Sequence, residues 1–261
     1  MSSSSFMFRN AVATAWQQAA GYTAPMNARL LALALALACG AHAAVILRSP
    51  EASFKPVADK LHSTVIDVNG RVPVSADGAT AVAGRVTHGT GTLLANGLAV
   101  TTLHAVALPS PAGKLIPLQD VEVQVAGGNA MAAQVIAGAP DLDLAILALP
   151  AEAASLEAAP LSTDALTEGD PLLAMGVDGD AVVVVGVSVV AVNGDILSVG
   201  GNRILDSRFW GGPLYDERGR LVGIELMSLG PAKAISASFI QRLLDQRAGK
   251  HVMTGASEHD P

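Results

Sequence analysis

The sequence predicts a mostly β fold, arranged as a barrel or a sandwich. From Val65 onward, hydrophobic runs of roughly five to ten residues alternate with turn signals, which is the rhythm of short strands. Aromatic residues make up only 3% of the chain, and Val, Ala and Gly are abundant, a mixture that suits packed strands better than a helical bundle. A chain of 261 residues can bury one large core or two smaller ones.

The N-terminal part has the layout of a secretory signal. Met26 to Arg29 precede an apolar run over 30–38 and the small-residue motif Ala41-His42-Ala43, so we expect cleavage before Ala44. The protein would then be periplasmic or secreted. The stretch before Met26 is either a long n-region or lies upstream of a true start at Met26.

An uncleaved inner-membrane anchor is the alternative for the same segment. It would run from Leu30 to Leu47, although Gly40 and His42 interrupt it. Cys39 is the only cysteine and fits a lipoprotein signal only loosely, so signal cleavage leaves a mature domain without a thiol. Disulfides and thiol catalysis are thereby excluded.

The expected elements follow the hydrophobic pattern along the chain. Residues 49–62 form a polar lead-in that can be helical, and strands over 90–95 and 98–102 flank Asn96-Gly97, a dipeptide typical of tight hairpins. Further strands are expected at Val121–Val125, Ala132–Ala137, Leu144–Leu149, Leu172–Met175, Ala181–Val192, Ile204–Leu205 and Leu221–Met227. Turn residues at 126–128, 193–195 and 216–219 separate several of these strands.

The second half of the chain ends in a predicted helix. Phe239, Ile240, Leu243 and Leu244 have helical spacing within Ser236–Ala248, which indicates a helix laid on the barrel. We divide the chain into the leader, 1–43, a folded domain, 60–248, and a tail expected to be disordered, 249–261. Within the folded domain, residues 150–166 would connect two halves, and no segment is long enough for an appended PDZ domain.

Three segments carry a resemblance to a known family. They are Ala99-Val-Thr-Thr-Leu-His104, Asp141-Leu-Asp143-Leu-Ala-Ile-Leu, and Gly211-Gly-Pro-Leu before a strand ending at Ile224. In this order they resemble the His, Asp and Ser segments of trypsin-like serine proteases, in particular the bacterial HtrA-like (DegP-like) protease domain. Supporting matches are His88-Gly-Thr-Gly-Thr-Leu-Leu, Glu168-Gly-Asp-Pro-Leu-Leu-Ala-Met-Gly176 and Val185-Gly-Val-Ser-Val.

The resemblance implies a chymotrypsin-like fold over residues 60–245, with two six-stranded antiparallel β-barrels and a C-terminal helix. It also implies nucleophilic acyl transfer, in which a histidine accepts the proton of a serine hydroxyl and an aspartate orients that histidine. His104 and Asp143 match the histidine and the aspartate. We expect them within hydrogen-bonding distance of each other, where the barrels meet.

The nucleophile position does not match the family. Trp210 stands directly before Gly211-Gly212-Pro213, where the family has its serine, and the indole has no hydroxyl or thiol that His104 could activate. We expect its ring to project toward His104 or the adjoining specificity pocket. Arg208 replaces a glycine whose amide helps to form the oxyanion hole in the family. The oxyanion-hole region, which spans Arg208, Phe209, Trp210 and Gly211, therefore departs from the family at Arg208 and Trp210.

Ser207 is the alternative nucleophile, three positions before Trp210, and it would need a rebuilt loop to reach His104. A purely structural interpretation of His104 and Asp143 is that they persist as a hydrogen-bonded pair. Removing one would leave the other unsatisfied, at a cost of about 1–3 kcal/mol. Glu225 could select basic side chains, but a solvated strand edge is the favoured interpretation.

The sequence therefore favours an exported pseudoprotease that binds a protein or peptide ligand. The alternatives are an active serine endopeptidase that uses Ser207, and a structural subunit of an envelope complex. Nucleic acid is not an expected partner, because the net charge is -7 and no basic stripe is present. No cofactor is expected, and the histidines lack the spacing of zinc ligands, namely His62, His88, His251 and His259.

Overall fold

The computed structural model describes residues 50–71, 86–109, 115–118, 120–125, 128–201, 205–228 and 230–249. The expected signal segment, the alternative anchor over 30–47, Ile204 and residues 250–261 of the tail lie outside these ranges. None of the helices within them is long and apolar enough to cross a membrane.

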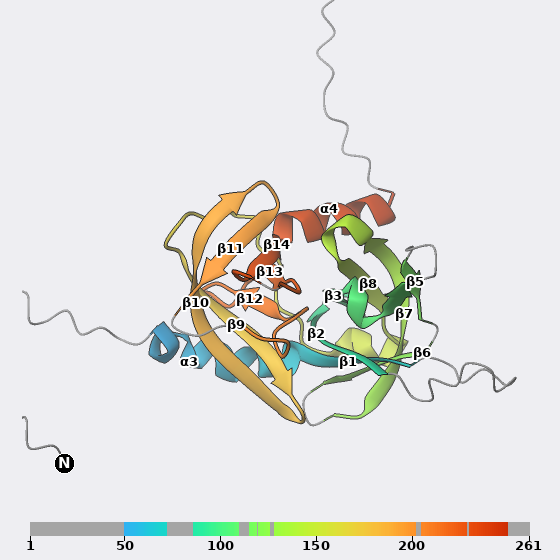
Figure 1. The fold of residues 1–261 in the computed structure, drawn as a ribbon. Helices are drawn as coiled ribbons and strands as arrows, with labels where there is room; N and C mark the ends of the chain where they lie inside the picture. Colours follow the sequence, from blue (N-terminus) through green and yellow to red (C-terminus); the bar gives the residue numbers. More distant parts are fainter. Residues whose placement is uncertain are drawn as a thin grey trace, which may run out of the picture. The chain divides into compact units, whose positions relative to one another are not determined.

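The first barrel closes through six antiparallel strands in the order β1-β2-β3-β8-β7-β6 (Figure 1). Its strands are β1 (Val65–Arg71), β2 (Val86–Leu94), β3 (Leu98–Thr102), β6 (Asp120–Val125), β7 (Ala130–Ala139) and β8 (Leu144–Ala148). A separate two-stranded sheet joins β4 (Ala107–Pro109) to β5 (Leu115–Pro117). The turn between β2 and β3 has positive φ at both Asn96 (64°) and Gly97 (68°), which explains why this dipeptide closes the hairpin.

The second barrel also closes through six antiparallel strands, in the order β10-β11-β14-β13-β12-β9. Its strands are β9 (Pro171–Asp178), β10 (Ala181–Asn193), β11 (Ile196–Gly200), β12 (Pro213–Tyr215), β13 (Leu221–Glu225) and β14 (Lys233–Ser236). The chain passes from one barrel to the other between β8 and β9. The predicted fold class, two six-stranded barrels with a C-terminal helix, is confirmed.

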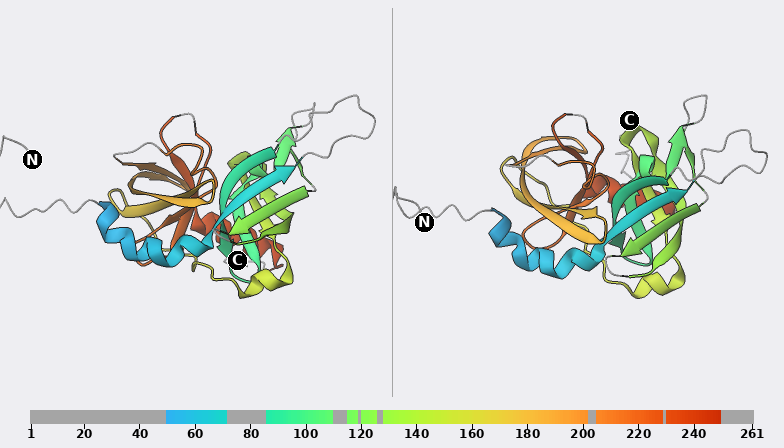
Figure 2. Two further views of the ribbon diagram at one scale, coloured as in Figure 1. Left: turned by 90° about the horizontal axis from the view of Figure 1, so that it is seen from below. Right: turned by 60° about the horizontal axis from the view of Figure 1, so that its bottom comes forward.

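Helices cover the outside of the barrels (Figures 1 and 2). They are α3 (Pro50–Leu61) and α4 (Ala237–Arg247), and short 3₁₀ turns occur at η1 (His62–Thr64), η2 (Leu103–Ala105), η3 (Pro140–Leu142) and η4 (Ala151–Ser155). Helix α4 begins where the Ser236 hydroxyl accepts a hydrogen bond from the Phe239 amide, at 3.4 Å, as an N-cap does. Its apolar face, predicted from the spacing of Phe239 and Ile240, packs on the core between the barrels.

The two barrels share a hydrophobic seam in addition to their own cores. Buried side chains from both barrels form one cluster, with Val100 and Leu144 from the first and Met175 and Ile224 from the second. Tyr215 of β12 lies in the same cluster, and its hydroxyl reaches the Thr64 hydroxyl at 2.6 Å and the Thr92 hydroxyl at 2.9 Å. The seam therefore has both apolar packing and buried hydrogen bonds.

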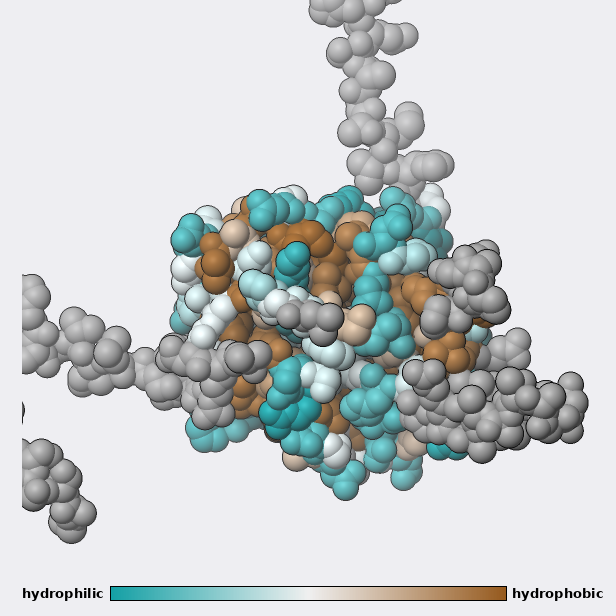
Figure 3. Space-filling model, viewed as in Figure 1, coloured by the Kyte–Doolittle hydropathy of each residue, from teal (hydrophilic) through white to brown (hydrophobic). Residues whose placement is uncertain are grey.

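The outer face seen in Figure 3 mixes hydrophobic and hydrophilic residues. Three valines on β10 are among the exposed large hydrophobic residues, Val184, Val190 and Val192. They alternate with buried valines on the same strand, Val185, Val187 and Val189, because successive side chains of a strand point to opposite faces.

One predicted strand is not found. Leu205 lies outside any strand, and Ile204 lies outside the described residues. The apolar pair was interpreted as a strand, whereas Leu205 instead buries its side chain in the core of the second barrel without pairing. The strands β11, β12 and β14 were not predicted, since they are only three to five residues long.

Candidate active site

His104 and Asp143 come together at the end of the first barrel. His104 lies in η2 directly after β3, and Asp143 follows η3 in a left-handed conformation (φ 49°, ψ 42°) directly before β8. The Asp143 Oδ2 atom lies 2.7 Å from His104 Nδ1, and its Oδ1 atom accepts a hydrogen bond of 2.9 Å from the His104 amide. One carboxylate therefore fixes both the backbone and the ring of the histidine.

The other ring nitrogen of His104, Nε2, forms no hydrogen bond with the part of the chain that the structure describes. This atom is buried, although a quarter of the side chain is exposed (24%). The Trp210 ring packs edge-on against the imidazole, with ring centroids 5.9 Å apart and an interplanar angle of 80°. The expected projection of Trp210 toward His104 is thus observed, and the contact is an aromatic one.

The turn that carries Trp210 bonds its own amides. The Phe209 amide donates to the Asp206 carbonyl at 3.0 Å, the Trp210 amide to the Ser207 carbonyl at 3.4 Å, and the Gly212 amide to the Phe209 carbonyl at 2.7 Å. The Arg208 amide donates to the Asp206 side chain at 3.1 Å. The amides of Arg208 and Trp210, which stand where the family forms its oxyanion hole, are therefore both engaged within the turn.

The Arg208 side chain points out of the turn and forms an exposed ion-pair network. Its guanidinium contacts Asp206 through Nε and Nη2, and Nη1 reaches Asp178 at the end of β9 at 2.9 Å. These carboxylates raise the pKa of Arg208, and Arg208 lowers the pKa of Asp206 by hydrogen bonding to it. Arg208 does not take a positive φ, so the backbone avoids the conformation in which a Cβ would be costly.

Thr90 of the first barrel holds this turn by hydrogen bonds to two of its carbonyl groups. The Thr90 amide donates to the Trp210 carbonyl at 2.9 Å, and the Thr90 hydroxyl donates to the Arg208 carbonyl at 2.7 Å. Gly211 has a positive φ of 83°, and a Cβ there would collide with the Thr90 carbonyl oxygen. The following Gly212 is equally close to the carbonyl of Met175. Close approach of three backbone segments therefore requires both glycines.

Ser207 does not reach the imidazole. Its side chain is exposed and its carbonyl accepts the hydrogen bond from the Trp210 amide. Because His104 Nε2 has no partner among the described residues, no bond joins these two side chains in this conformation.

The expectation of a solvated edge at Glu225 is wrong. Its side chain is only 2% exposed, and its Oε2 atom is buried without a partner among the described residues. The Glu225 carbonyl accepts from the Gly211 amide at 2.8 Å, and its amide donates to the Gly212 carbonyl at 2.9 Å, so β13 runs directly alongside the altered turn. Burial raises the pKa of Glu225 to about 8.

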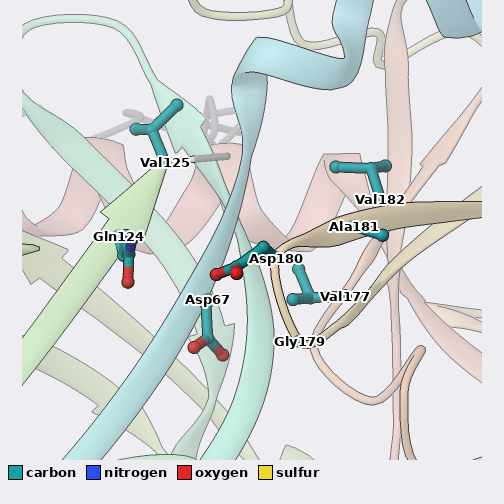
Figure 4. A pocket seen from close by; sticks show the side chains of 8 residues that line it. All are labelled: Asp67, Gln124, Val125, Val177, Gly179, Asp180, Ala181 and Val182. Carbon is teal, nitrogen blue, oxygen red and sulfur yellow. The ribbon is translucent and has the colours of Figure 1, made fainter. Parts of the chain in front are cut away.

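A small pocket near the seam brings together residues that the sequence did not single out. Asp67 and Gln124 of the first barrel line it together with Asp180 in the turn between β9 and β10 (Figure 4). Asp67 Oδ1 lies 2.7 Å from His88 Nε2, and hydrogen bonding to Asp67 raises the pKa of His88. In the sequence, Asp67 is one of three polar residues that alternate along the strand Val65–Arg71, which gives no signal of a partner 21 positions away. The described residues contain no group of three or more His, Cys, Asp or Glu side chains that could hold a metal ion.

Comparison with known proteins places this geometry in a family. The sequence matches the family described as a trypsin-like peptidase domain over residues 89–224, which is just over half of the chain. No match is found among curated proteins.

Solved structures of serine proteases have the same fold. The Rv3671c protease from M. tuberculosis, in its active form, has a TM-score of 0.61 at 18% identity, covering 79% of this chain and 90% of that chain. Its inactive form has a TM-score of 0.57 at 18% identity, covering 76% and 95%. The serine endoprotease from Yersinia pestis has a TM-score of 0.59 at 20% identity, covering 74% of this chain and 66% of its own. At such low identity these similarities concern the fold alone. The family match over more than half of the sequence shows that this chain belongs to the trypsin-like peptidase domain family.

Proposed function

We propose that this chain is an exported serine protease homologue that lacks hydrolytic activity and binds a protein or peptide at the surface around Trp210. The observation that carries the proposal is the indole ring of Trp210, which lies edge-on to His104 at the position of the family's serine. An indole offers no oxygen or sulfur that an imidazole could activate, so an acyl-enzyme cannot form at this position.

The backbone of the same turn supports the proposal. Acyl transfer requires free amides pointing at the developing oxyanion, and the amides of Arg208 and Trp210 are bonded to Asp206 and Ser207 instead. Losing one such donor costs about 10²–10³ in rate. The nucleophile and the oxyanion hole are therefore both absent from this conformation.

The intact pair of His104 and Asp143 does not by itself argue for hydrolysis. Asp143 bonds the backbone amide of His104 as well as its ring, so the pair also holds η2 against η3. Removing either partner would leave a half-buried polar group unsatisfied, at a cost of about 1–3 kcal/mol. Structural necessity alone is enough to keep the two residues together.

Active hydrolysis through Ser207 is the second candidate. It is favoured by the exposed hydroxyl of Ser207 on the same turn as Trp210 and by the oriented imidazole of His104. To use Ser207, the turn would have to release the hydrogen bond between its carbonyl and the Trp210 amide.

Labelling with a fluorophosphonate probe, together with casein cleavage, tests for hydrolysis. The wild type should show neither reaction above the level of the His104→Ala variant, because no side chain is activated. Labelling or cleavage in the wild type that disappears in Ser207→Ala would overturn the proposal and establish the second candidate.

Binding is tested with a pool of N-terminally fluorescein-labelled heptapeptides of degenerate sequence, followed by fluorescence anisotropy. Trp210→Ala should weaken binding at least tenfold if the ligand packs against the indole. Ile116→Ala is the matched control, since Ile116 is an exposed hydrophobic residue on the two-stranded sheet of the first barrel. Equal binding by both variants would place the ligand elsewhere.

Export is tested separately, by mass spectrometry of the protein recovered from outside the cytoplasm. An N-terminus at Ala44 is expected. An intact segment over residues 26–43 would rule out cleavage and favour the anchor alternative.

A further inference from the structure

We infer that Arg208 forms a carboxylate-binding site beside Trp210, which takes the C-terminal carboxylate of a bound peptide, and that Asp206 occupies this site in the free protein. The inference rests on the proposed function, because it names the ligand class of the same surface. It adds that the ligand is a chain end rather than an internal peptide segment.

The contacts of Asp206 define the site. Its Oδ1 atom accepts hydrogen bonds from the Arg208 amide at 3.1 Å and from Nε at 2.9 Å, and its Oδ2 atom accepts from Nε at 3.2 Å and from Nη2 at 2.7 Å. One carboxylate thus receives a two-pronged guanidinium contact and a backbone amide together. Such charge-assisted, bidentate contacts are the strongest and most selective that a carboxylate forms with a protein.

Asp178 holds the guanidinium from the other side. Its Oδ2 atom accepts from Nη1 at 2.9 Å, and it belongs to β9 rather than to the turn. The Nε and Nη2 edge therefore keeps its orientation when Asp206 moves away. The Asp178 carboxylate therefore anchors Arg208, and the Asp206 carboxylate is the one that can be exchanged.

Asp206 is suited to exchange because it is not enclosed. Its side chain is 46% exposed, so water can solvate the carboxylate once it is displaced. Arg208 is similarly accessible, at 44%. An incoming carboxylate would replace Asp206 like for like, and no charge would be left buried and unpaired.

The surroundings favour a carboxylate at a chain end over other anions. A doubly charged phosphate would meet stronger repulsion from Asp178 and the displaced Asp206 than a singly charged carboxylate would. Trp210 follows Arg208 by two residues and faces His104, whose buried Nε2 lacks a partner among the described residues. A peptide lying against Trp210 would therefore have its C-terminus within reach of the Arg208 guanidinium on the same turn. With no hydroxyl at Trp210, this end is held and not processed.

The experiment compares the fluorescein-labelled heptapeptide pool synthesised as free acids with the same pool synthesised as C-terminal amides. Wild-type protein should bind the free acids several-fold more tightly, because only a carboxylate can take the place of Asp206 on the guanidinium and the gain is limited by the contact that Asp206 gives up. The amide pool contains Asp and Glu at its degenerate positions, so it also reports on side-chain carboxylates.

Two variants test the residues. Arg208→Gln should abolish the preference for free acids and leave the binding of amides unchanged. Asp206→Asn should tighten the binding of free acids several-fold, since it removes the internal competitor, without affecting the amides. Arg71→Gln is the matched control, because Arg71 is an exposed arginine with a single carboxylate partner, Glu122, on the first barrel.

The outcomes separate the inference from the proposed function. Equal binding of acids and amides by the wild type, or a preference that survives in Arg208→Gln, overturns the inference while the peptide-binding function stands. Failure of both pools to bind overturns the function and the inference together. Thermal unfolding of each variant should match the wild type, since both side chains are exposed, and Arg208→Lys serves in place of Arg208→Gln if the latter unfolds.

Discussion

The half of the site built on the first barrel and the half built on the second differ in how their polar groups are satisfied. On the first barrel, Asp143 bonds both the ring and the amide of His104, and His104 Nε2 and Thr102 Oγ1 are left without a partner among the described residues. On the second barrel, the turn from Asp206 to Gly212 bonds the amides of Arg208, Phe209, Trp210 and Gly212 to its own oxygens, and the Gly211 amide donates to the Glu225 carbonyl. The first half retains a geometry that could serve a reaction, whereas the second half has closed on itself.

The comparison shows which half of the site keeps its geometry without a bound ligand. The contact between His104 and Asp143 holds Asp143 in a left-handed conformation, but its hydrogen bonds satisfy polar groups of the two short turns themselves. An oxyanion hole needs amides held away from every internal acceptor, which costs free energy unless a ligand compensates. In this chain Trp210 stands at the position that corresponds to the family's serine, and the hydrogen bonds between Arg208 and Asp206 complete the closed turn.

A serine introduced at position 210 should give hydrolysis only if the backbone of the turn also opens. Trp210→Ser alone should give little hydrolysis, because the amides stay bonded within the turn. Trp210→Ser combined with Arg208→Gly should be about 10²–10³ faster, since glycine permits the open turn and removes the side chain that binds Asp206. Rates of fluorophosphonate labelling and casein cleavage measure the difference.

The control for this pair of variants is His104→Ala added to each, which should abolish any restored activity. Equal activity of the single and double variants would show that Arg208 is harmless and that the turn opens once the indole is gone. The second half of the site would then be as intact as the first.

The sequence predicted the parts of this site that depend on side-chain identity. The resemblance of the His, Asp and Gly-Gly-Pro segments to trypsin-like serine proteases implied that His104, Asp143 and Trp210 lie together, and the Asn96-Gly97 hairpin followed from backbone preference alone. The bonding of the turn could not be predicted, because the partners of the Arg208 amide depend on backbone angles that neighbouring residues set. Glu225 was misread for a related reason, since a single polar residue in a strand does not reveal which face is covered.

The glycines at the boundary between the halves should be less replaceable than other glycines of similar conformation. Gly211→Ala should destabilise the fold by about 3 kcal/mol, because its Cβ would collide with the Thr90 carbonyl oxygen in addition to straining a φ of 83°. Gly179→Ala is the control, since Gly179 also has a positive φ, of 60°, but no atom within 4 Å of the added Cβ. It should cost about 1 kcal/mol. Urea unfolding of both variants measures the difference, and equal losses would mean that the seam yields at Gly211.

Glu225 provides the smallest and most specific test, because it lies behind the closed turn on the second barrel. Burial raises the pKa of its carboxyl from 4.5 to about 8, so the folded state holds a proton that the unfolded state releases above pH 4.5. The free energy of unfolding of the wild type should therefore fall as the pH rises from about 4.5 to about 8, and this loss should be complete above that range. Glu225→Gln cannot ionise, so its stability relative to the wild type should improve by about 2 kcal/mol between pH 6 and pH 8. The comparison between two pH values cancels any constant cost of burying the amide.

The control is Glu217→Gln, in the exposed turn between β12 and β13, which should show no such pH dependence. A relative stability of Glu225→Gln that stays flat over this range would mean that the carboxyl gains a partner or water in solution, and that the second half of the site is more open than its closed turn implies.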